Sequence, residues 1–117
     1  DKAARLARGE EPLPAAQWTN RIHRDDCAGV IAHLIERALS GQSIDTCYVG
    51  VDDTPVPLFD VASGLADMLS VTADPSQQAA LQRGGSKQCS NKKLRAAGYN
   101  FKYPTWREGY ADIIASQ

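Results

Sequence analysis

The clearest hydrophobic pattern in the chain lies between residues 27 and 39. There apolar residues recur three or four positions apart, which is the spacing of one face of an α-helix. Gly41 follows as a typical helix end. Asp25 and Asp26 come directly before the pattern, and a carboxylate at that point can accept the free N–H groups of a first helical turn. We therefore predict an amphipathic helix capped by one of these aspartates.

Four further segments show helical signals. Ala, Leu and Arg dominate residues 2–8. Apolar residues recur at helical spacing from Leu58 to Leu69, after a proline that suits a first helical position. Asn91 can cap a short helix that runs to Ala97 and ends at Gly98. Thr105-x-x-Glu108 has the form of a capping box, which opens a terminal helix with Tyr110, Ile113 and Ile114 facing inward.

Strand signals alternate with these helices. Residues 18–23 alternate polar and apolar side chains, which indicates a short strand. Residues 47–51, Cys-Tyr-Val-Gly-Val, are almost continuously apolar and rich in β-formers, which is typical of a strand buried on both faces of an α/β sheet. Residues 86–89 form a third, weaker candidate. We expect an α/β fold with about four helices and two to four short strands.

Composition places the chain among ordinary globular domains. Its 117 residues, 43% hydrophobic and 23% charged, suffice for one core. A net charge of −1 and a sequence pI near 6.1 show no excess of positive charge of the kind that binds nucleic acid or an anionic membrane. No run approaches the roughly 20 apolar residues that cross a bilayer. We expect a cytoplasmic location, with neither nucleic acid nor a membrane as partner.

Few residues combine into a recognisable catalytic or metal site. Cys27, Cys47 and Cys89 are widely spaced, and we predict buried free thiols. The histidines are placed too irregularly to complete a zinc site. A dinucleotide-binding glycine turn, a phosphate loop and a serine nucleophile elbow are all missing from the sequence. We assign no catalytic, cofactor-binding or metal-binding residue to this chain.

Two acidic pairs are the remaining candidates for chemistry. His23 beside Asp25 and Asp26 could form an acid–base pair. A structural role is favoured, because neighbouring strand residues alternate faces and the aspartates suit the helix start. Asp52 and Asp53 precede Thr-Pro and are interpreted as turn formers rather than metal ligands.

Several motifs occur together in an order that carries a family resemblance. Residues 19–31, T-N-R-I-H-R-D-D-C-A-G-V-I, resemble the (R/Y)-I-H-x-D-D segment of extended and atypical short-chain dehydrogenase/reductases, the NAD-dependent epimerase/dehydratase family. Residues 48–56 are similar to that family's Y-N-V-x-D-D-x-P turn, with Val49 in place of asparagine. Residues 86–94 and 98–110 are similar to its G-K-R-C-S-N-x-x-L and G-Y-x-F-x-Y-P-x-x-R-E-G-Y ending. The similarity runs from about Trp18 to Ile114.

The resemblance implies that residues 1–117 are the C-terminal, substrate-binding part of a Rossmann-type enzyme such as a nucleoside-diphosphate-sugar epimerase. The family's glycine-rich fingerprint and Tyr-x-x-x-Lys pair do not occur here, so NAD or NADP is implied only for the parent protein. Substrate-pocket candidates are Asn20, Arg21 and Arg83. Thr19 stands where sugar-nucleotide epimerases have an arginine that contacts the substrate diphosphate, so that contact is not implied here.

Two functions are compatible with these observations. In the favoured one, the chain is part of an NAD(P)-dependent oxidoreductase or epimerase, is inactive alone, and is partnered by the parent's N-terminal dinucleotide-binding half and a small-molecule substrate. In the other, it is a freestanding binding or scaffold module without enzymatic activity. An upstream reading frame with a glycine-rich strand and a Tyr-x-x-x-Lys helix would separate them. Because residues 47–51 need covering, an isolated chain is also expected to self-associate.

Overall fold

The computed structural model describes residues 5, 8, 10, 13–14, 17–71, 78–79 and 85–117. This part of the chain has a mixed α/β fold. Its helices are α2 (Arg24–Leu39), α3 (Leu58–Met68), α4 (Lys92–Ala96) and α5 (Trp106–Ala115). Strand β1 (Leu13–Pro14) pairs in parallel with β4 (Gln78–Ala79), and β2 (Trp18–Thr19) pairs antiparallel with β3 (Val56–Pro57).

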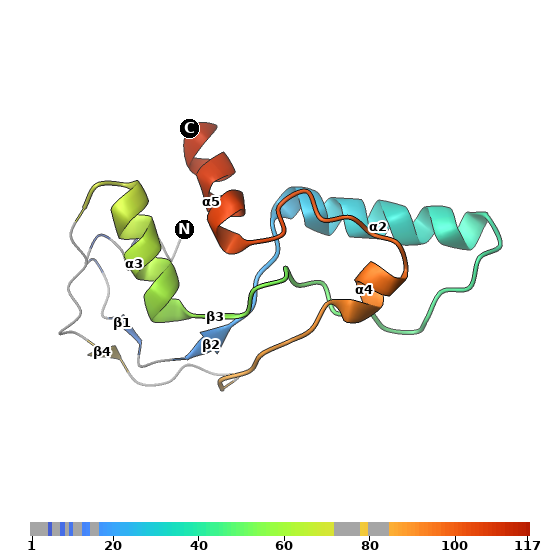
Figure 1. The fold of residues 1–117 in the computed structure, drawn as a ribbon, viewed down its shortest axis with the longest axis horizontal. Helices are drawn as coiled ribbons and strands as arrows, with labels where there is room; N and C mark the ends of the chain where they lie inside the picture. The colour runs from blue at the N-terminus through green and yellow to red at the C-terminus, as the bar shows by residue number, and fades with distance from the viewer. Residues whose placement is uncertain are drawn as a thin grey trace.

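The molecule is elongated, with principal extents of 53 × 31 × 16 Å. In Figure 1, α3 and the strands occupy one end, α2 and α4 the other, and α5 lies between them. None of the described helices combines the length and apolar character that crossing a membrane requires.

The main hydrophobic core lies between α3 and α5. Helix α3 buries an apolar face that includes Val61 and Leu65, and Trp106 packs against it from the start of α5. Gly64 makes this contact possible, because a Cβ atom at that position would collide with Cη2 of the Trp106 ring. The core therefore depends on a close approach between two helices.

The four helices predicted downstream of residue 24 are confirmed. Helix α2 ends next to Gly41, and α4 next to Gly98, and both glycines have positive φ angles, of 75° and 91°. The Thr105 hydroxyl accepts the Glu108 N–H at 3.4 Å, as the capping pattern predicts. The predicted helix at 2–8 falls mostly outside the described residues.

Two predicted caps are wrong. His23, not an aspartate, caps α2: its Nδ1 atom accepts the Asp25 N–H at 3.1 Å. Asn91 occupies the N-cap position of α4, but its side chain makes no capping bond there. Its amide instead donates to the Val51 carbonyl at 3.1 Å and to the Asp53 carboxylate at 2.7 Å. The Asn91 bonds join residues 40 and 38 positions apart in the chain, which a local sequence pattern does not reveal.

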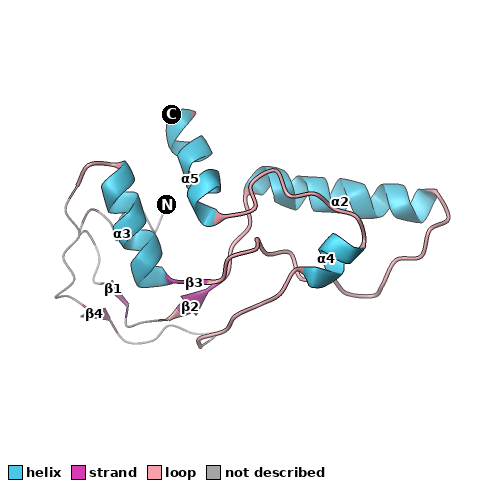
Figure 2. Ribbon diagram, in the orientation of Figure 1, coloured by secondary structure: helices cyan, strands magenta, loops and turns pink. Residues whose placement is uncertain are grey.

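The strand predicted at 47–51 is also wrong. Figure 2 shows the whole connection between α2 and β3 as loop. Val51 is buried but Val49 is exposed, since no described strand lies beside this segment. The segment 86–89 is likewise not a strand. A strand needs a neighbour to complete its hydrogen bonds, and the described residues supply none at these places.

The cysteines are free, as predicted, but they are not buried. Cys27 and Cys47 are exposed, and Cys89 is half-buried. Cys27 lies near the start of α2 and Cys47 in the long loop after it, and both line one open groove between the helix and the loop. Their exposure follows from the uncovered apolar surface around them.

Candidate functional site

The start of α2 is fixed to the loop before α5 by a buried carboxylate. Asp26 is fully buried, and its carboxylate accepts the Tyr99 hydroxyl at 2.7 Å and the Lys102 and Tyr103 N–H groups at 2.7 and 2.8 Å. Burial, together with the hydrogen bond to Asp26, raises the pKa of Tyr99 above its usual range. Asp26 therefore holds the loop at 99–103 against the helix.

His23 lies at the centre of this junction. Its ring stacks on Tyr103 with ring centroids 4.1 Å apart, and its side chain is 2% exposed. Gly109 of α5 lies against the same ring, since a Cβ there would be in van der Waals contact with His23 at 3.4 Å. With Nδ1 accepting from the helix, the proton belongs on Nε2. Nε2 lies 3.3 Å from an Asp112 oxygen, close enough for attraction but not aligned for a hydrogen bond.

A pocket of about 140 Å³ opens beside His23. Its walls come from the segment 21–24 at the start of α2, from the turn after residue 51 and from α5 with its cap residue. The polar members include Arg21, His23, Arg24, Asp52 and Thr105. The apolar wall includes Trp106. A small cavity with an apolar wall and a few converging polar groups is the usual form of a small-molecule site.

Arg21 and Asp52 give the pocket its electrostatic character. The Asp52 N–H donates to the Arg21 carbonyl at 2.7 Å, which joins the two segments. Burial raises the pKa of the Asp52 carboxyl, partly offset by the Thr54 N–H at 3.0 Å and by the positive charge of Arg21. The Arg21 Nη1 atom is buried and has no hydrogen-bond acceptor in the described part of the chain. Arg21 thus gives the pocket a positive charge, and its Nη1 group is a hydrogen-bond donor without an acceptor among the described residues.

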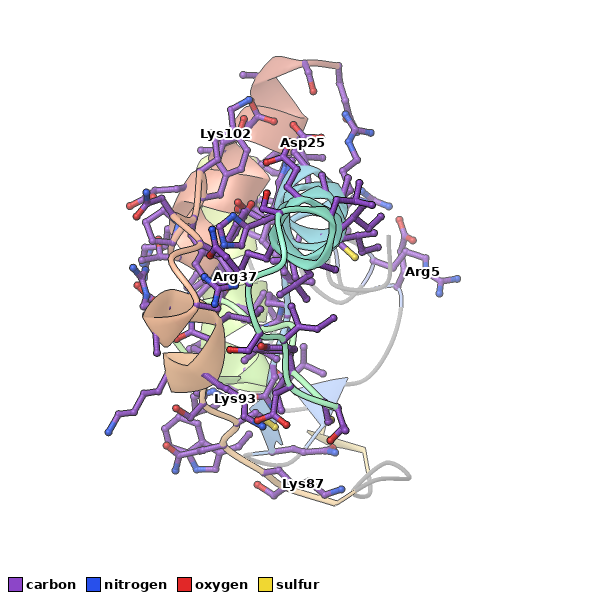
Figure 3. All side chains as sticks on the ribbon, turned by 90° about the vertical axis from the view of Figure 1, so that its right-hand side faces the viewer. Arg5, Asp25, Arg37, Lys87, Lys93 and Lys102 are labelled. Atoms are coloured by element: carbon purple, nitrogen blue, oxygen red, sulfur yellow. The ribbon has the colours of Figure 1, made fainter. Side chains whose placement is uncertain are left out.

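Asp25, Lys102 and Asp112 form a charged cluster next to the His23 ring. Lys102 Nζ is 3.8 Å from an Asp25 oxygen, and Figure 3, which looks along α2, shows these two side chains close together. The hydrogen bond with Tyr103 raises the pKa of Lys102, and the charges of Asp25 and Asp112 add to the effect. The hydrogen bond to Asp112 raises the pKa of Tyr103, which keeps this phenol protonated at neutral pH.

The same cluster offers three groups that could ligate a metal ion. One atom each from His23, Asp25 and Asp112 lies within 4.8 Å of the others. The His23 Nδ1 atom is already used as the helix cap, and Lys102 supplies a cation beside the carboxylates. Nδ1 is therefore not free to bind a metal ion, and Lys102 offsets part of the negative charge of the carboxylates.

The structure separates the predicted substrate contacts. Arg21 lines the pocket. The Asn20 side chain instead binds the segment after residue 85, donating to the Lys87 carbonyl at 3.0 Å and accepting the Cys89 N–H at 2.8 Å. Arg83 falls outside the described residues. A substrate contact by Asn20 or Arg83 stays a prediction.

Sequence reasoning missed two members of this site. Asp52 was interpreted only as a turn former, and it does accept the Thr54 N–H, but it also lines the pocket. Trp106 received no role, although it lies directly inside the capping box that starts α5. A large aromatic residue at a first helical position was the available signal for a contact beyond the helix.

Comparison with known proteins gives one informative match. No family model and no curated protein matches the chain. Its fold is similar to the solved structure of a protein from Methylobacillus flagellatus described as an NAD-dependent epimerase/dehydratase, with a TM-score of 0.83 and 34% sequence identity. The match covers 98% of this chain. The resemblance to NAD-dependent epimerase/dehydratases is confirmed. At this identity the similarity extends beyond general topology.

The chain spans 41% of the Methylobacillus flagellatus protein. More than half of that epimerase/dehydratase-like protein therefore has no counterpart here. The mixed α/β fold predicted from the sequence agrees with this match.

Proposed function

We propose that this chain is the C-terminal, substrate-side part of an NAD(P)-dependent oxidoreductase or epimerase and is not catalytically competent alone. The observation that carries the proposal is the match over 98% of this chain to 41% of a protein described as an NAD-dependent epimerase/dehydratase. The cofactor, NAD or NADP, is bound by an N-terminal dinucleotide-binding part, and this chain contributes a wall of the substrate pocket.

The pocket beside His23 supports this division of labour. It contains a buried cation at Arg21 and an apolar wall at Trp106, which are groups for binding and orienting a ligand. Hydride transfer would depend on a nicotinamide, and this chain's residues would hold an anionic group of the substrate.

Cofactor titration tests the assignment. We expect the 117-residue chain to show no saturable heat on titration with NAD(H) or NADP(H), and the full-length polypeptide from the same gene to bind one of them. The full-length protein is then assayed with sugar nucleotides and other small anionic substrates. Tight binding of either dinucleotide by the chain alone would overturn the proposal. A full-length protein that binds neither dinucleotide would overturn it as well.

A substitution at Arg21 tests the pocket. Arg21→Ala in the full-length protein should raise KM about 10- to 100-fold, because a charge-assisted hydrogen bond contributes roughly 1.5–3 kcal/mol. Turnover at saturation should change much less, since the contact is made in the ground state as well. Lys92→Ala removes the same charge from the exposed surface of α4 and is the matched control. Equal effects of the two changes would exclude Arg21 from the substrate site.

A further inference from the structure

We infer that the pocket beside His23 binds the carboxylate group of a carboxylic acid substrate, which names the substrate class for the function proposed above and rests on that function. The carboxylate pairs its single negative charge with Arg21, and the carbon atoms next to it pack against the apolar wall of the pocket. The inference is carried by two buried donors without acceptors, by the charges around the pocket and by its size.

Two buried hydrogen-bond donors without acceptors belong to residues that line this one pocket. The Arg21 Nη1 and His23 Nε2 atoms are buried, and neither has a hydrogen-bond partner among the described residues. Asp112 lies 3.3 Å from Nε2 but is not aligned to accept its proton. Native proteins pair nearly all of their buried polar groups, so two unpaired donors on one cavity indicate that a ligand supplies the acceptors.

The positive charge of Arg21 favours an anionic ligand over water. Water could accept hydrogen bonds from both donors, but it would leave this charge unbalanced. Within the described part of the chain, no carboxylate forms an ion pair with Arg21. Asp52 attracts the guanidinium only from beyond ion-pair distance. A buried charge is costly unless it is paired, so the ligand that suits this pocket best carries a negative charge.

The charges around the pocket limit the ligand to one negative charge. Arg24, a second cation on the pocket, is largely exposed and lies 3.7 Å from an Asp25 oxygen. Asp52 lines the pocket and Asp112 lies beside His23, so two carboxylates are already close to the ligand. A phosphate monoester carries about −1.5 to −2 charges at neutral pH, and its second charge would meet these carboxylates. A carboxylate brings one charge and two acceptor oxygens, one for each unpaired donor.

The size of the pocket agrees with a carboxylate and a short stretch of carbon chain. A water molecule takes up about 30 Å³ in the liquid, so the pocket of about 140 Å³ holds roughly five groups of that size. A nucleoside diphosphate is far larger than this space. The carbon chain would lie against Ile22, Trp106 and Ile113, which form the apolar wall.

Matched small molecules test the inference on the unaltered protein. Butanoate and butanamide have nearly the same shape, but only butanoate is charged, and inorganic phosphate carries a larger negative charge. Each is titrated into the isotope-labelled full-length polypeptide, and the NMR signals of the Trp106 indole N–H and the Arg21 Nε–H report occupancy of the pocket. We expect saturable shifts with butanoate, at a Kd about tenfold or more below those of butanamide and phosphate, because hydrogen bonds to a charged acceptor are the stronger ones.

Substitutions at Arg21 test its part in binding. Arg21→Met removes the charge but keeps a long side chain, and it should weaken butanoate binding about tenfold or more. Arg21→Lys restores a cation and should recover part of the affinity. Lys92→Met removes the same charge from the exposed surface of α4 and should leave the Kd unchanged. Circular dichroism checks that the variants stay folded, and the comparison of butanoate with butanamide needs no variant.

Three results would overturn the inference. One is butanamide or phosphate binding as tightly as butanoate, another is no saturable binding of butanoate, and the third is unchanged butanoate affinity in Arg21→Met. Any of these in a full-length polypeptide that binds NAD(P)H would refute the carboxylate site alone. Carboxylate binding in a full-length polypeptide that binds neither dinucleotide would instead refute the proposed function.

Discussion

The Asp26 carboxylate offers the sharpest test of how this fold is held together. It is fully buried and accepts three hydrogen bonds, from the Tyr99 hydroxyl and from the Lys102 and Tyr103 N–H groups. Asp26→Asn keeps the shape of the side chain and changes only its hydrogen-bonding capacity. The Asn carbonyl oxygen can replace Oδ1, which serves Tyr99 and Lys102. The NH₂ group then faces the Tyr103 N–H, so one buried donor meets another.

The expected cost follows from these bonds. An unsatisfied buried donor costs about 1–3 kcal/mol, and bonds to a charged acceptor are stronger than those to a neutral one. We expect Asp26→Asn to lower the free energy of unfolding by about 2–4 kcal/mol. Tyr99→Phe removes one donor and leaves the carboxylate with two, so it should cost about 1–2 kcal/mol.

Urea unfolding followed by circular dichroism measures both changes, and the double variant completes a cycle. The two substitutions share a hydrogen bond, so their effects should fall short of additive by about 0.5 kcal/mol or more. Ala28→Ser, at an exposed position of the next turn, is the control and should change little. If Asp26→Asn unfolds at the same urea concentration as the wild type, Asp26 does not hold the 99–103 loop.

Other predictions concern the neighbouring aspartates and the core. Burial raises the pKa of Asp52 above its unfolded value, so the charged form is disfavoured in the fold; Asp52→Asn should stabilise the chain at pH 7 and have no effect below about pH 4. A lower stability of this variant at pH 7 in urea unfolding would contradict the argument. The hydrogen bond from Arg95 holds the pKa of Asp53 below its usual range, so Asp53→Asn should cost at most about 1 kcal/mol at pH 7, and the loss should fade as the pH drops below 4. A loss that persists at pH 2 would rule out the ion pair as its cause. Gly64→Ala should lower stability by about 1–3 kcal/mol, because its methyl group collides with Trp106; equal melting temperatures for it and for the exposed control Asp67→Ala would refute that packing.

The helices could be predicted because their signals are local. The apolar spacing of α2 and the Thr105 cap both lie within one element, and the positive φ of Gly98 requires only the residue itself. The failed strand at 47–51 had an equally clear pattern. A strand, however, is completed by a neighbour, and no local pattern reveals whether that neighbour is present.

The site was less predictable for the same reason. Two aspartates before a helix are compatible with capping or with any distant contact, and Asp26 makes the distant one. Arg21 was one of three substrate-pocket candidates, and it does line the pocket. The side chains that surround it, Asp52 and Trp106, come from parts of the chain that only the tertiary fold brings together.

The separation along the chain between Asp26 and its partners constrains how the protein is made. Its three hydrogen bonds join residues 73, 76 and 77 positions apart, and those of Asn20 span 67 and 69. Contacts of such long range form slowly, because the intervening chain must be ordered first. During synthesis, the first turn of α2 leaves the ribosome long before residues 99–103 exist. Until they emerge, Asp26 must stay hydrated, so a nascent chain cannot bury the start of α2 before residues 99–103 have been translated.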